Sequence, residues 1–232
     1  MFHRYGGCRH GMQWAMWLGV LLFAGQAVAQ ASAPRVSTAG QHALQSSQQQ
    51  SRTVLVVGDS LSAGYGIAAA QGWVSLLDDR LAKRDPPWRV VNASISGETS
   101  AGGAARIVNE VVRNKPSVVV IELGANDGLR GLPLPDLRRN LARMVGASKS
   151  IGAKVLVVGM RLPPNYGPAY TKEFERGFCA IARLLDVACL PFLLEPIAQD
   201  RSAFQDDNLH PIASAQPALR DHVWPALVPL LD

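Results

Sequence analysis

A run of five β-branched or aliphatic residues, Thr53 to Val57, is followed directly by Gly58, Asp59 and Ser60. A short apolar run that ends on glycine is typical of a strand buried on both faces of a parallel sheet. Ser60 is therefore predicted at the carboxyl end of a strand, which is where open α/β sheets bind their ligands. The same position would also suit the N-cap of an ordinary helix, so the strand alone does not decide the role of Ser60.

The chain beyond this strand alternates between helical and strand patterns. Helices are expected over 72–84, 102–114, 136–150, 170–186 and 213–230, and further strands over 88–93, 117–123, 154–160 and 187–193. The last helix should be irregular because it contains three prolines. Such alternation predicts a parallel sheet with right-handed crossovers. We expect an α/β, flavodoxin-like three-layer sandwich: a five-stranded parallel sheet of order 2-1-3-4-5 with helices on both faces.

The first 29 residues have the three parts of a secretory signal peptide. Arg4 and Arg9 make a basic start, residues 14–25 form an uncharged and largely apolar run, and Ala27-Val28-Ala29 is a small-x-small cleavage site. The apolar run is shorter than the roughly 20 residues that a membrane-spanning helix needs, although a retained anchor is the alternative. We predict cleavage after Ala29 and a periplasmic or secreted protein.

Residues 30–52 are polar and of low complexity, with no acidic residue, so we expect a disordered spacer followed by one folded domain over 53–232. Two cysteines, Cys179 and Cys189, remain after cleavage. Export would permit a disulfide between them. However, Cys179 lies off the apolar face of its predicted helix, so a bridge and two unpaired thiols both stay open.

Several classes of function are disfavoured by composition and missing motifs. The formal charge of +5 is not clustered, and no basic run is interleaved with aromatic residues, so we expect no nucleic-acid partner. The chain lacks a nucleotide P-loop, a G-x-G-x-x-G turn at the first helix, and the G-x-S-x-G elbow of the usual α/β-hydrolases. The histidines and cysteines of the body have no metal-ligand spacing, so no metal or cofactor is expected.

Only two histidines, His210 and His222, belong to residues 53–232. His210 lies in a loop between the fifth strand and the last helix, and Asp207 precedes it by three residues. This carboxylate could fix the tautomer of the imidazole and stabilise its charged form. Asp206 is an alternative partner, but the D-x-x-H spacing favours Asp207. His222 is expected to be a solvated residue of the last helix.

Two further strand ends supply hydrogen-bond donors. Gly97 follows the second strand in a turn, and Asn126 follows the third. A backbone N–H at Gly97, the amide of Asn126 and the N–H of Ser60 would together form an oxyanion hole. The plainer alternative for Asn126 is that it only ties its own loop together. Asp59 is expected to accept backbone N–H groups that hold the Ser60 turn, and Glu122 to be a structural partner within the fold.

Four segments, GDSLSAGYG, NASISGETS, GANDG and DNLH, occur in this order. Together they resemble the four blocks of the SGNH (GDSL) hydrolase family, and the resemblance covers about residues 53–231. It implies that Ser60 is the nucleophile, His210 the base and Asp207 the acid that orients it, with Ser60, Gly97 and Asn126 as the oxyanion hole. It also implies that the loops over 128–133 and 161–167 form the walls of a pocket for an acyl chain, with Leu129, Leu132, Leu162 and Tyr166 as the apolar lining.

The resemblance further implies a serine esterase that hydrolyses carboxylic esters, and acyl thioesters or lysophospholipids, through an acyl-enzyme. We expect a monomer without cofactor, and lipid substrates would be compatible with transient contact with a membrane surface. One rival is a carbohydrate O-deacetylase on the same fold, which the apolar loops over 128–133 and 161–167 disfavour. A second is a non-catalytic periplasmic lipid-binding module, which the complete set of reactive residues disfavours. The sequence does not specify acyl chain length.

Overall fold

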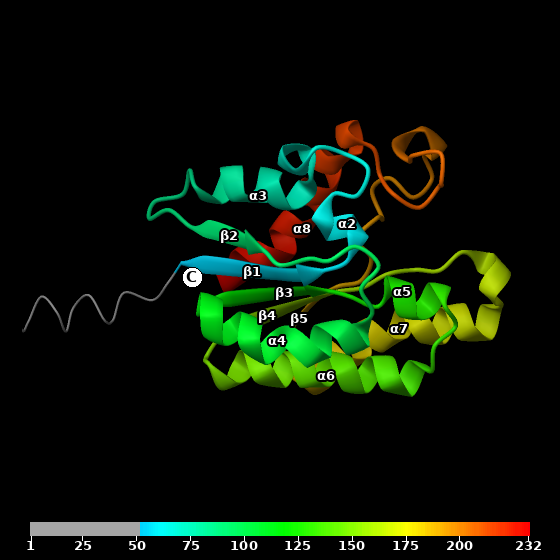
Figure 1. Ribbon diagram of the computed structural model, residues 1–232, viewed down its shortest axis with the longest axis horizontal. Helices are drawn as coiled ribbons and strands as arrows, with labels where there is room; N and C mark the ends of the chain where they lie inside the picture. Colours follow the sequence, from blue (N-terminus) through cyan, green and yellow to red (C-terminus); the bar gives the residue numbers. More distant parts are fainter. Residues whose placement is uncertain (1–51) are drawn as a thin grey trace, which may run out of the picture. The chain divides into compact units, whose positions relative to one another are not determined.

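The computed structural model describes residues 52–232, so the predicted signal peptide and nearly all of the predicted spacer lie outside the described residues. Five parallel strands form one sheet in the order β2-β1-β3-β4-β5, which confirms the predicted order. Figure 1 shows them edge to edge. The strands are β1 (Thr53–Gly58), β2 (Arg89–Asn92), β3 (Val118–Glu122), β4 (Lys154–Val158) and β5 (Ala188–Leu190).

Helices cover both faces of this sheet (Figure 1). One face carries α4 (Ser100–Asn114), α6 (Leu134–Ser150) and α7 (Pro168–Leu184), and the other carries α3 (Trp73–Leu81) and α8 (Gln216–Leu227). The last predicted helix is irregular as expected, because α8 is flanked by the short turns η4 (Ala213–Ala215) and η5 (Val228–Leu230) and contains Pro225. The architecture is the predicted three-layer α/β sandwich.

The core lies on the two central strands. Every residue of β1 and β3 is buried, as an unbroken aliphatic run predicts for strands covered on both faces. β5 is shorter than the strand expected over 187–193, since it ends at Leu190. Pro191 follows and has no N–H to donate to a neighbouring strand, which explains the early end.

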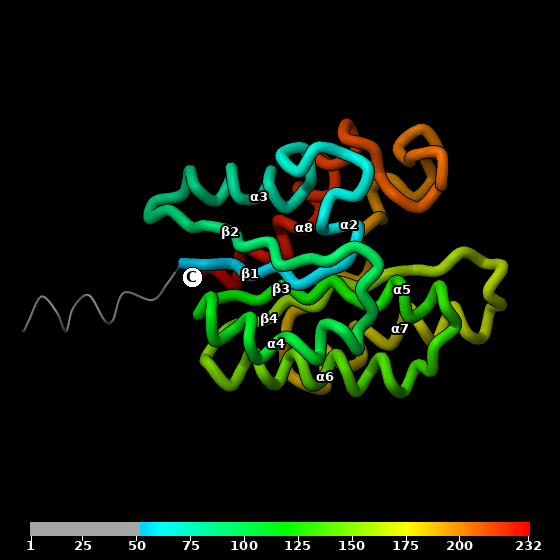
Figure 2. Tube along the Cα trace, in the orientation of Figure 1, coloured from blue at the N-terminus to red at the C-terminus, as the bar shows by residue number. Residues whose placement is uncertain are grey.

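All five strands point the same way, so their following loops leave the sheet at one end. Figure 2 shows the chain passing there through α2 (Ser60–Ala63) after β1 and through α5 (Ala125–Leu129) after β3. The loop after β4 contains η2 (Pro164–Tyr166), and the long segment after β5 contains η3 (Arg201–Ala203). Each site residue expected from the sequence lies in one of these loops or just beyond it.

Cys179 of α7 and Cys189 of β5 form a disulfide, with 2.04 Å between the sulfur atoms. The structure therefore decides between the two alternatives that the sequence left open. The remaining short turn, η1 (Ala69–Gln71), precedes α3. Within residues 52–232, no helix combines the length and the hydropathy needed to cross a membrane.

Candidate active site

Ser60 is the first residue of α2 and follows β1 after a single residue, Asp59. Asp59 is the N-cap of this short helix, and its Oδ1 accepts a hydrogen bond from the N–H of Leu61 at 3.1 Å. Asp59 is completely buried, whereas Ser60 is partly exposed and lines a cavity. The buried carboxylate thus holds the turn that presents the Ser60 hydroxyl, as expected for Asp59 from the sequence.

His210 joins Ser60 to Asp207. Its Nε2 lies 2.9 Å from the Oγ of Ser60, and its Nδ1 lies 2.6 Å from the Oδ2 of Asp207. The other carboxylate oxygen of Asp207 accepts the backbone N–H groups of Leu209 (2.9 Å) and His210 (3.0 Å). A hydroxyl, an imidazole and a carboxylate in this chain of contacts can deprotonate the hydroxyl and stabilise the imidazolium that forms.

The carboxylate beside His210 is held in its charged form. Burial opposes ionisation of Asp207, but the hydrogen bonds from the His210 backbone and ring and from Leu209 outweigh it and lower its pKa to about 2. Asp207 is therefore ionised throughout the neutral range. The structure also separates it from Asp206, whose backbone carbonyl instead accepts the side-chain amide of Asn208 at 3.3 Å.

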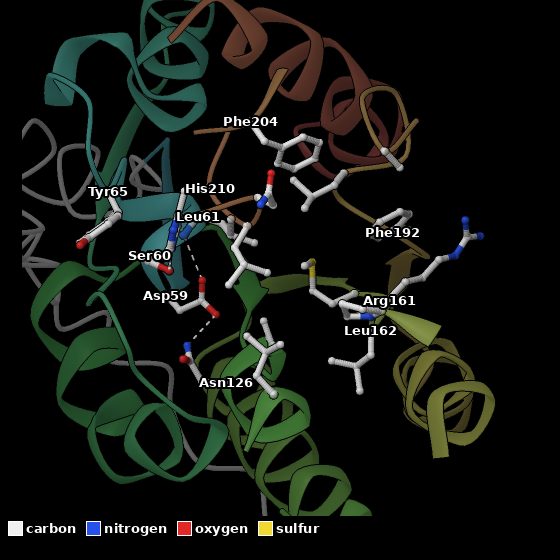
Figure 3. A pocket seen from close by; sticks show the side chains of 18 of the residues that line it. Asp59, Ser60, Leu61, Tyr65, Asn126, Arg161, Leu162, Phe192, Phe204 and His210 are labelled. Atoms are coloured by element: carbon white, nitrogen blue, oxygen red, sulfur yellow. Dashed lines mark hydrogen bonds between the residues drawn. The ribbon is translucent and has the colours of Figure 1, made fainter. Parts of the chain in front are cut away.

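Asn126 and Gly97 border the same cavity as Ser60. The Asn126 amide donates to the Oδ2 of Asp59 at 3.2 Å and to the carbonyl of Glu98 at 3.0 Å. Gly97 has φ +79°, a conformation that favours glycine, and its carbonyl accepts the guanidinium of Arg130 at 2.9 Å. Asn126 therefore does tie loops together, as the plainer alternative held, and it also faces the space above Ser60 (Figure 3).

A second buried acid, Glu122, lies beneath the Ser60 turn. Its Oε2 accepts the hydroxyl of Ser62 at 2.7 Å and lies 3.5 Å from the backbone nitrogen of Asp59. Complete burial, and then the nearby charge of Asp59, raise the pKa of Glu122 well above its usual range. Burial likewise raises the pKa of Asp59 to about 6, although hydrogen bonds from Leu61 and Asn126 and the charge of His210 oppose the shift. Glu122 is thus a structural partner of the turn.

The cavity beside Ser60 has a volume of about 700 Å³ and a mainly apolar wall. Ser60, His210 and Asn126 lie at one side of it, and Arg161, Leu162 and Phe192 at the other (Figure 3). Apolar residues from the loops after β3, β4 and β5 make up most of the wall: Leu129, Met160, Leu162, Pro163, Pro164, Phe192, Leu194 and Phe204. A volume of this size suits a small organic substrate with an apolar part.

Two residues expected in this wall are not part of it. Leu129 and Leu162 line the cavity, but Leu132 and Tyr166 do not. Leu132 is exposed at the surface. Tyr166 lies in η2, and its hydroxyl turns back to donate to the carbonyl of Leu129 at 3.1 Å, so it supports the wall from outside.

The wall also contains residues that the sequence reasoning missed. Met160 follows β4, Phe192 follows β5, and Phe204 lies next to the loop of His210. Their positions after strands were the only signal that could have indicated them. His222 differs from its prediction as well: it is partly buried, and its Nε2 lies 3.0 Å from the carbonyl oxygen of Phe192.

No metal site accompanies this arrangement in the part of the chain that the structure describes: no three His, Cys, Asp or Glu side chains of residues 52–232 are grouped to hold an ion. A hydroxyl in contact with an imidazole, the amide of Asn126 at the cavity border and an apolar wall are groups that acyl transfer can use.

Comparison with known proteins gives consistent matches. Residues 56–216 match the model of the GDSL-like Lipase/Acylhydrolase family. "Esterase TesA" of Pseudomonas aeruginosa is 50% identical over 184 residues, covering 79% of this chain and 92% of the relative. "Thioesterase 1/protease 1/lysophospholipase L1" of Escherichia coli (strain K12) is 39% identical over 180 residues, covering 78% of this chain and 85% of the relative.

Solved structures agree with this result. A crystal structure of TesA has a TM-score of 0.75 and 51% identity, and the match covers 77% of this chain and 99% of that chain. The psychrotrophic esterase EstA from Pseudoalteromonas sp., solved after inhibition by monoethylphosphonate, has a TM-score of 0.74 and 39% identity, with 78% and 98% covered.

Proposed function

The chain belongs to the GDSL-like lipase/acylhydrolase family, and on that premise we propose that Ser60, His210 and Asp207 are its catalytic triad. The protein is a serine esterase of the SGNH type that acts on small-molecule esters. The observation that carries the residue assignment is the 2.9 Å contact between the Oγ of Ser60 and the Nε2 of His210, whose other ring nitrogen contacts Asp207.

In the first half of the reaction, His210 accepts the Ser60 proton on Nε2 while Oγ attacks the ester carbonyl carbon. The carbonyl oxygen becomes an alkoxide, which accepts hydrogen bonds from the Asn126 amide and from the backbone N–H groups of Gly97 and Ser60. The tetrahedral species collapses, the bond to the leaving group breaks, and His210 returns its proton to the departing oxygen or sulfur. An acyl ester on Ser60 remains.

In the second half, water replaces the leaving group and the same residues act in reverse order. His210 accepts a proton from the water, whose oxygen attacks the acyl carbonyl. The three donors again stabilise the alkoxide, and collapse releases the carboxylic acid as His210 returns the proton to Oγ. Asp207 stays ionised throughout and stabilises the imidazolium in both steps, which its low pKa supports.

We further infer that acyl thioesters and lysophospholipids are among the substrates. The apolar wall supports an acyl chain, and two relatives carry thioesterase or arylesterase in their names. Tyr65 and Leu209 line the cavity and are also exposed, which supports transient contact of the cavity mouth with a membrane surface. A panel of p-nitrophenyl esters, acyl-CoAs and lysophospholipids of increasing chain length would rank these substrates.

Export to the periplasm or the medium remains our proposal for location. The signal-peptide pattern of residues 1–29 supports it, and so does the disulfide between Cys179 and Cys189, since such bonds persist mainly in oxidising compartments. Fractionation of expressing cells and mass determination of the mature N-terminus would test export and cleavage after Ala29. We also propose a monomer, which sedimentation measurements would test.

The decisive experiment for the catalytic assignment is Ser60→Ala. We expect loss of ester hydrolysis and of labelling by a fluorophosphonate, which reacts only with an activated serine hydroxyl. His222→Ala, which removes the other histidine of the body, should be labelled and active. Substantial hydrolysis by a folded Ser60→Ala protein would overturn the mechanism. Absence of labelling in the wild type would favour the lipid-binding alternative, and activity on acetylated xylan alone would favour the deacetylase.

A further inference from the structure

The loop that carries His210 is exposed yet accurately placed. Asp206, Asp207, Asn208 and Leu209 are all exposed, so burial of the loop cannot account for its position. Its two ends are joined: the N–H of Gln205 donates to the carbonyl of His210 at 2.8 Å, and Phe204 pairs with Pro211 in an antiparallel bridge. These bonds close the loop on itself, but they do not connect it to Ser60.

The side chain of Gln205 makes that connection. Its Nε2 donates to the carbonyl of Tyr65 at 2.8 Å and to the carbonyl of Pro211 at 3.2 Å. The N–H of Tyr65 in turn donates to the carbonyl of Ser60 at 3.1 Å. One amide group therefore links the segment of the nucleophile to the segment of the histidine, across 140 positions of the sequence.

Tyr65 adds a second contact between the same two segments. Its ring lies against the imidazole of His210, with 4.5 Å between the ring centroids and an angle of 41° between the planes. Figure 3 shows Tyr65 beside His210. The backbone position that Gln205 holds is thus also the one that places an aromatic ring against the imidazole.

Gly66 leaves the space that the Gln205 amide occupies. Gly66 has φ +76°, and a Cβ added to it would lie 2.1 Å from the Oε1 of Gln205 and 2.8 Å from its Cδ. Any side chain at position 66 would have to displace this amide. The glycine and the glutamine, far apart in the sequence, therefore depend on each other.

We propose that Gln205 is a positioning residue that holds the His210 loop against the Ser60 turn and so sets the distance between Oγ and Nε2. The proposal rests on the catalytic roles proposed above for Ser60 and His210. A misplacement of reacting groups by about 1 Å can cost about 100-fold in rate. Gln205 does not line the cavity, so its loss should act on the chemical step rather than on substrate binding.

The test compares Gln205→Ala and Gln205→Glu with the wild type. Glutamate keeps the shape, but its carboxylate cannot donate to the two carbonyl groups. We expect both variants to lose about 10- to 100-fold in kcat on a short p-nitrophenyl ester, and the same factor in the rate of fluorophosphonate labelling, with KM changed less than threefold. Gln71→Ala is the matched control, because it removes an exposed glutamine outside the cavity, and it should leave kcat unchanged.

Gly66→Ala provides an independent test through a double-mutant cycle. It should lower kcat and the labelling rate in the wild type, because the new Cβ displaces the Gln205 amide. In Gln205→Ala, where no amide is present, the same change should lower kcat by a smaller factor than in the wild type. The backbone strain of alanine at φ +76° is common to both backgrounds and cancels in the cycle. If Gln205→Ala does not fold, Gln205→Glu and Gly66→Ala provide the test instead, and both should lower kcat and the labelling rate.

The proposal is overturned if folded Gln205 variants keep kcat and the labelling rate within threefold of the wild type. It is also overturned if kcat falls only in step with the melting temperature, or if the effects of Gly66→Ala and Gln205→Ala simply add. Failure of the catalytic assignment itself would look different, because Ser60→Ala would then remain active whatever the Gln205 variants do.

Discussion

The side-chain amide of Asn126 donates a hydrogen bond to the buried carboxylate of Asp59, with 3.2 Å between Nδ2 and Oδ2. Asp59 immediately precedes Ser60, so the amide is oriented relative to the nucleophile before any substrate arrives. Both N–H groups of this amide are engaged, one with Asp59 and one with the carbonyl of Glu98, so a developing oxyanion would have to share or replace one of these acceptors. This contact therefore links the turn after β1 to the loop after β3 at the point where charge would develop.

Replacing Asn126 by Ala should remove one donor to the oxyanion. We expect kcat to fall on the order of 10²–10³-fold, with a small change in KM, because the donor acts mainly in the transition state. Steady-state kinetics on a p-nitrophenyl ester would measure both constants. Asn114→Ala is a suitable control, since that amide caps the end of α4 and should be dispensable for turnover. A loss smaller than threefold in Asn126→Ala would contradict the assigned role.

Asp207 and Asp206 provide a matched pair of neighbouring acids. Asp207→Asn keeps the shape of the side chain but presents an amide to His210, which disfavours the required tautomer and leaves the imidazolium without its counter-charge. The loss in kcat should approach the order of 10⁴-fold found in other triads. Asp206→Asn should be close to wild type. Equal losses of kcat in the two variants would contradict the assignment of Asp207, rather than Asp206, as the acid that orients His210.

Arg161 lies at the end of the cavity away from Ser60 (Figure 3). Its guanidinium pairs with Glu175 (2.7 Å) and Glu195 (2.8 Å) and lies 4.8 Å from the ring centroid of Phe192. Arg161→Ala should open this end and shift the preference toward longer acyl chains, by roughly fourfold in kcat/KM for each additional buried methylene. Esters of acetate and butyrate should react as before.

The measurement for Arg161 is kcat/KM across p-nitrophenyl esters of increasing chain length. Arg138→Ala serves as the control, because it also breaks an arginine–glutamate pair of α7, with Glu173, outside the cavity. An unchanged profile in Arg161→Ala would mean that another part of the wall limits the chain.

The buried carboxyl of Asp59 should make stability depend on pH. Its pKa is raised from 3.8 to about 6 in the folded protein, so the native state binds more protons than the unfolded state between these values. The free energy of unfolding should therefore fall as the pH rises from about 4 to about 6, on the order of 2–3 kcal/mol. Asp59→Asn should reduce this slope, because its side-chain oxygen can still accept the N–H of Leu61 but carries no charge. Glu122, whose pKa is also raised by burial, should keep a slope of the same sign in the variant.

Urea denaturation at several pH values between 4 and 6.5 would measure the slope. The exposed Asp79→Asn should follow the wild type. Parallel curves for wild type and Asp59→Asn would show that the carboxyl does not control stability in this range.

The disulfide between α7 and β5 should contribute to stability without affecting catalysis. Replacing Cys179 and Cys189 by Ser should lower the free energy of unfolding by about 2–3 kcal/mol, the range for a loop of about ten residues. Neither cysteine lines the cavity, so kcat at 25 °C should be unchanged. The free energies of unfolding of the double variant and of the reduced wild type should agree in urea denaturation. A large loss of kcat in the folded double variant would show that the disulfide also affects catalysis.

Local patterns were sufficient for much of the fold and of the candidate site. The aliphatic runs of β1 and β3 admit few structures other than buried parallel strands, and their alternation with amphipathic helices restricts the strand order. The choice of His210 followed from having two histidines in the body, and the choice of Asp207 from the reach of a carboxylate three residues away. Both groups lie where this reasoning expected them.

Other features depended on how distant segments pack. Leu132 and Tyr166 belong to the expected loops, yet neither lines the cavity. The Tyr166 hydroxyl turns back to the carbonyl of Leu129, and Leu132 is exposed at the surface. Phe192 and Phe204 enter the wall because the segment after β5 leaves the sheet at Pro191. No short sequence motif predicts the course of this segment.

By itself, the sequence determined the class of fold and the strand order, because these follow from side-chain periodicity along the chain. It also supplied the candidate residues for acyl transfer, through short motifs at the ends of the strands. Only the tertiary structure decided which side chains meet: the Cys179–Cys189 bridge between α7 and β5, the Arg161 end of the cavity, and the amide of Gln205 between Tyr65 and Pro211. Such contacts join segments whose approach depends on the packing of the whole sheet, and no local preference encodes them.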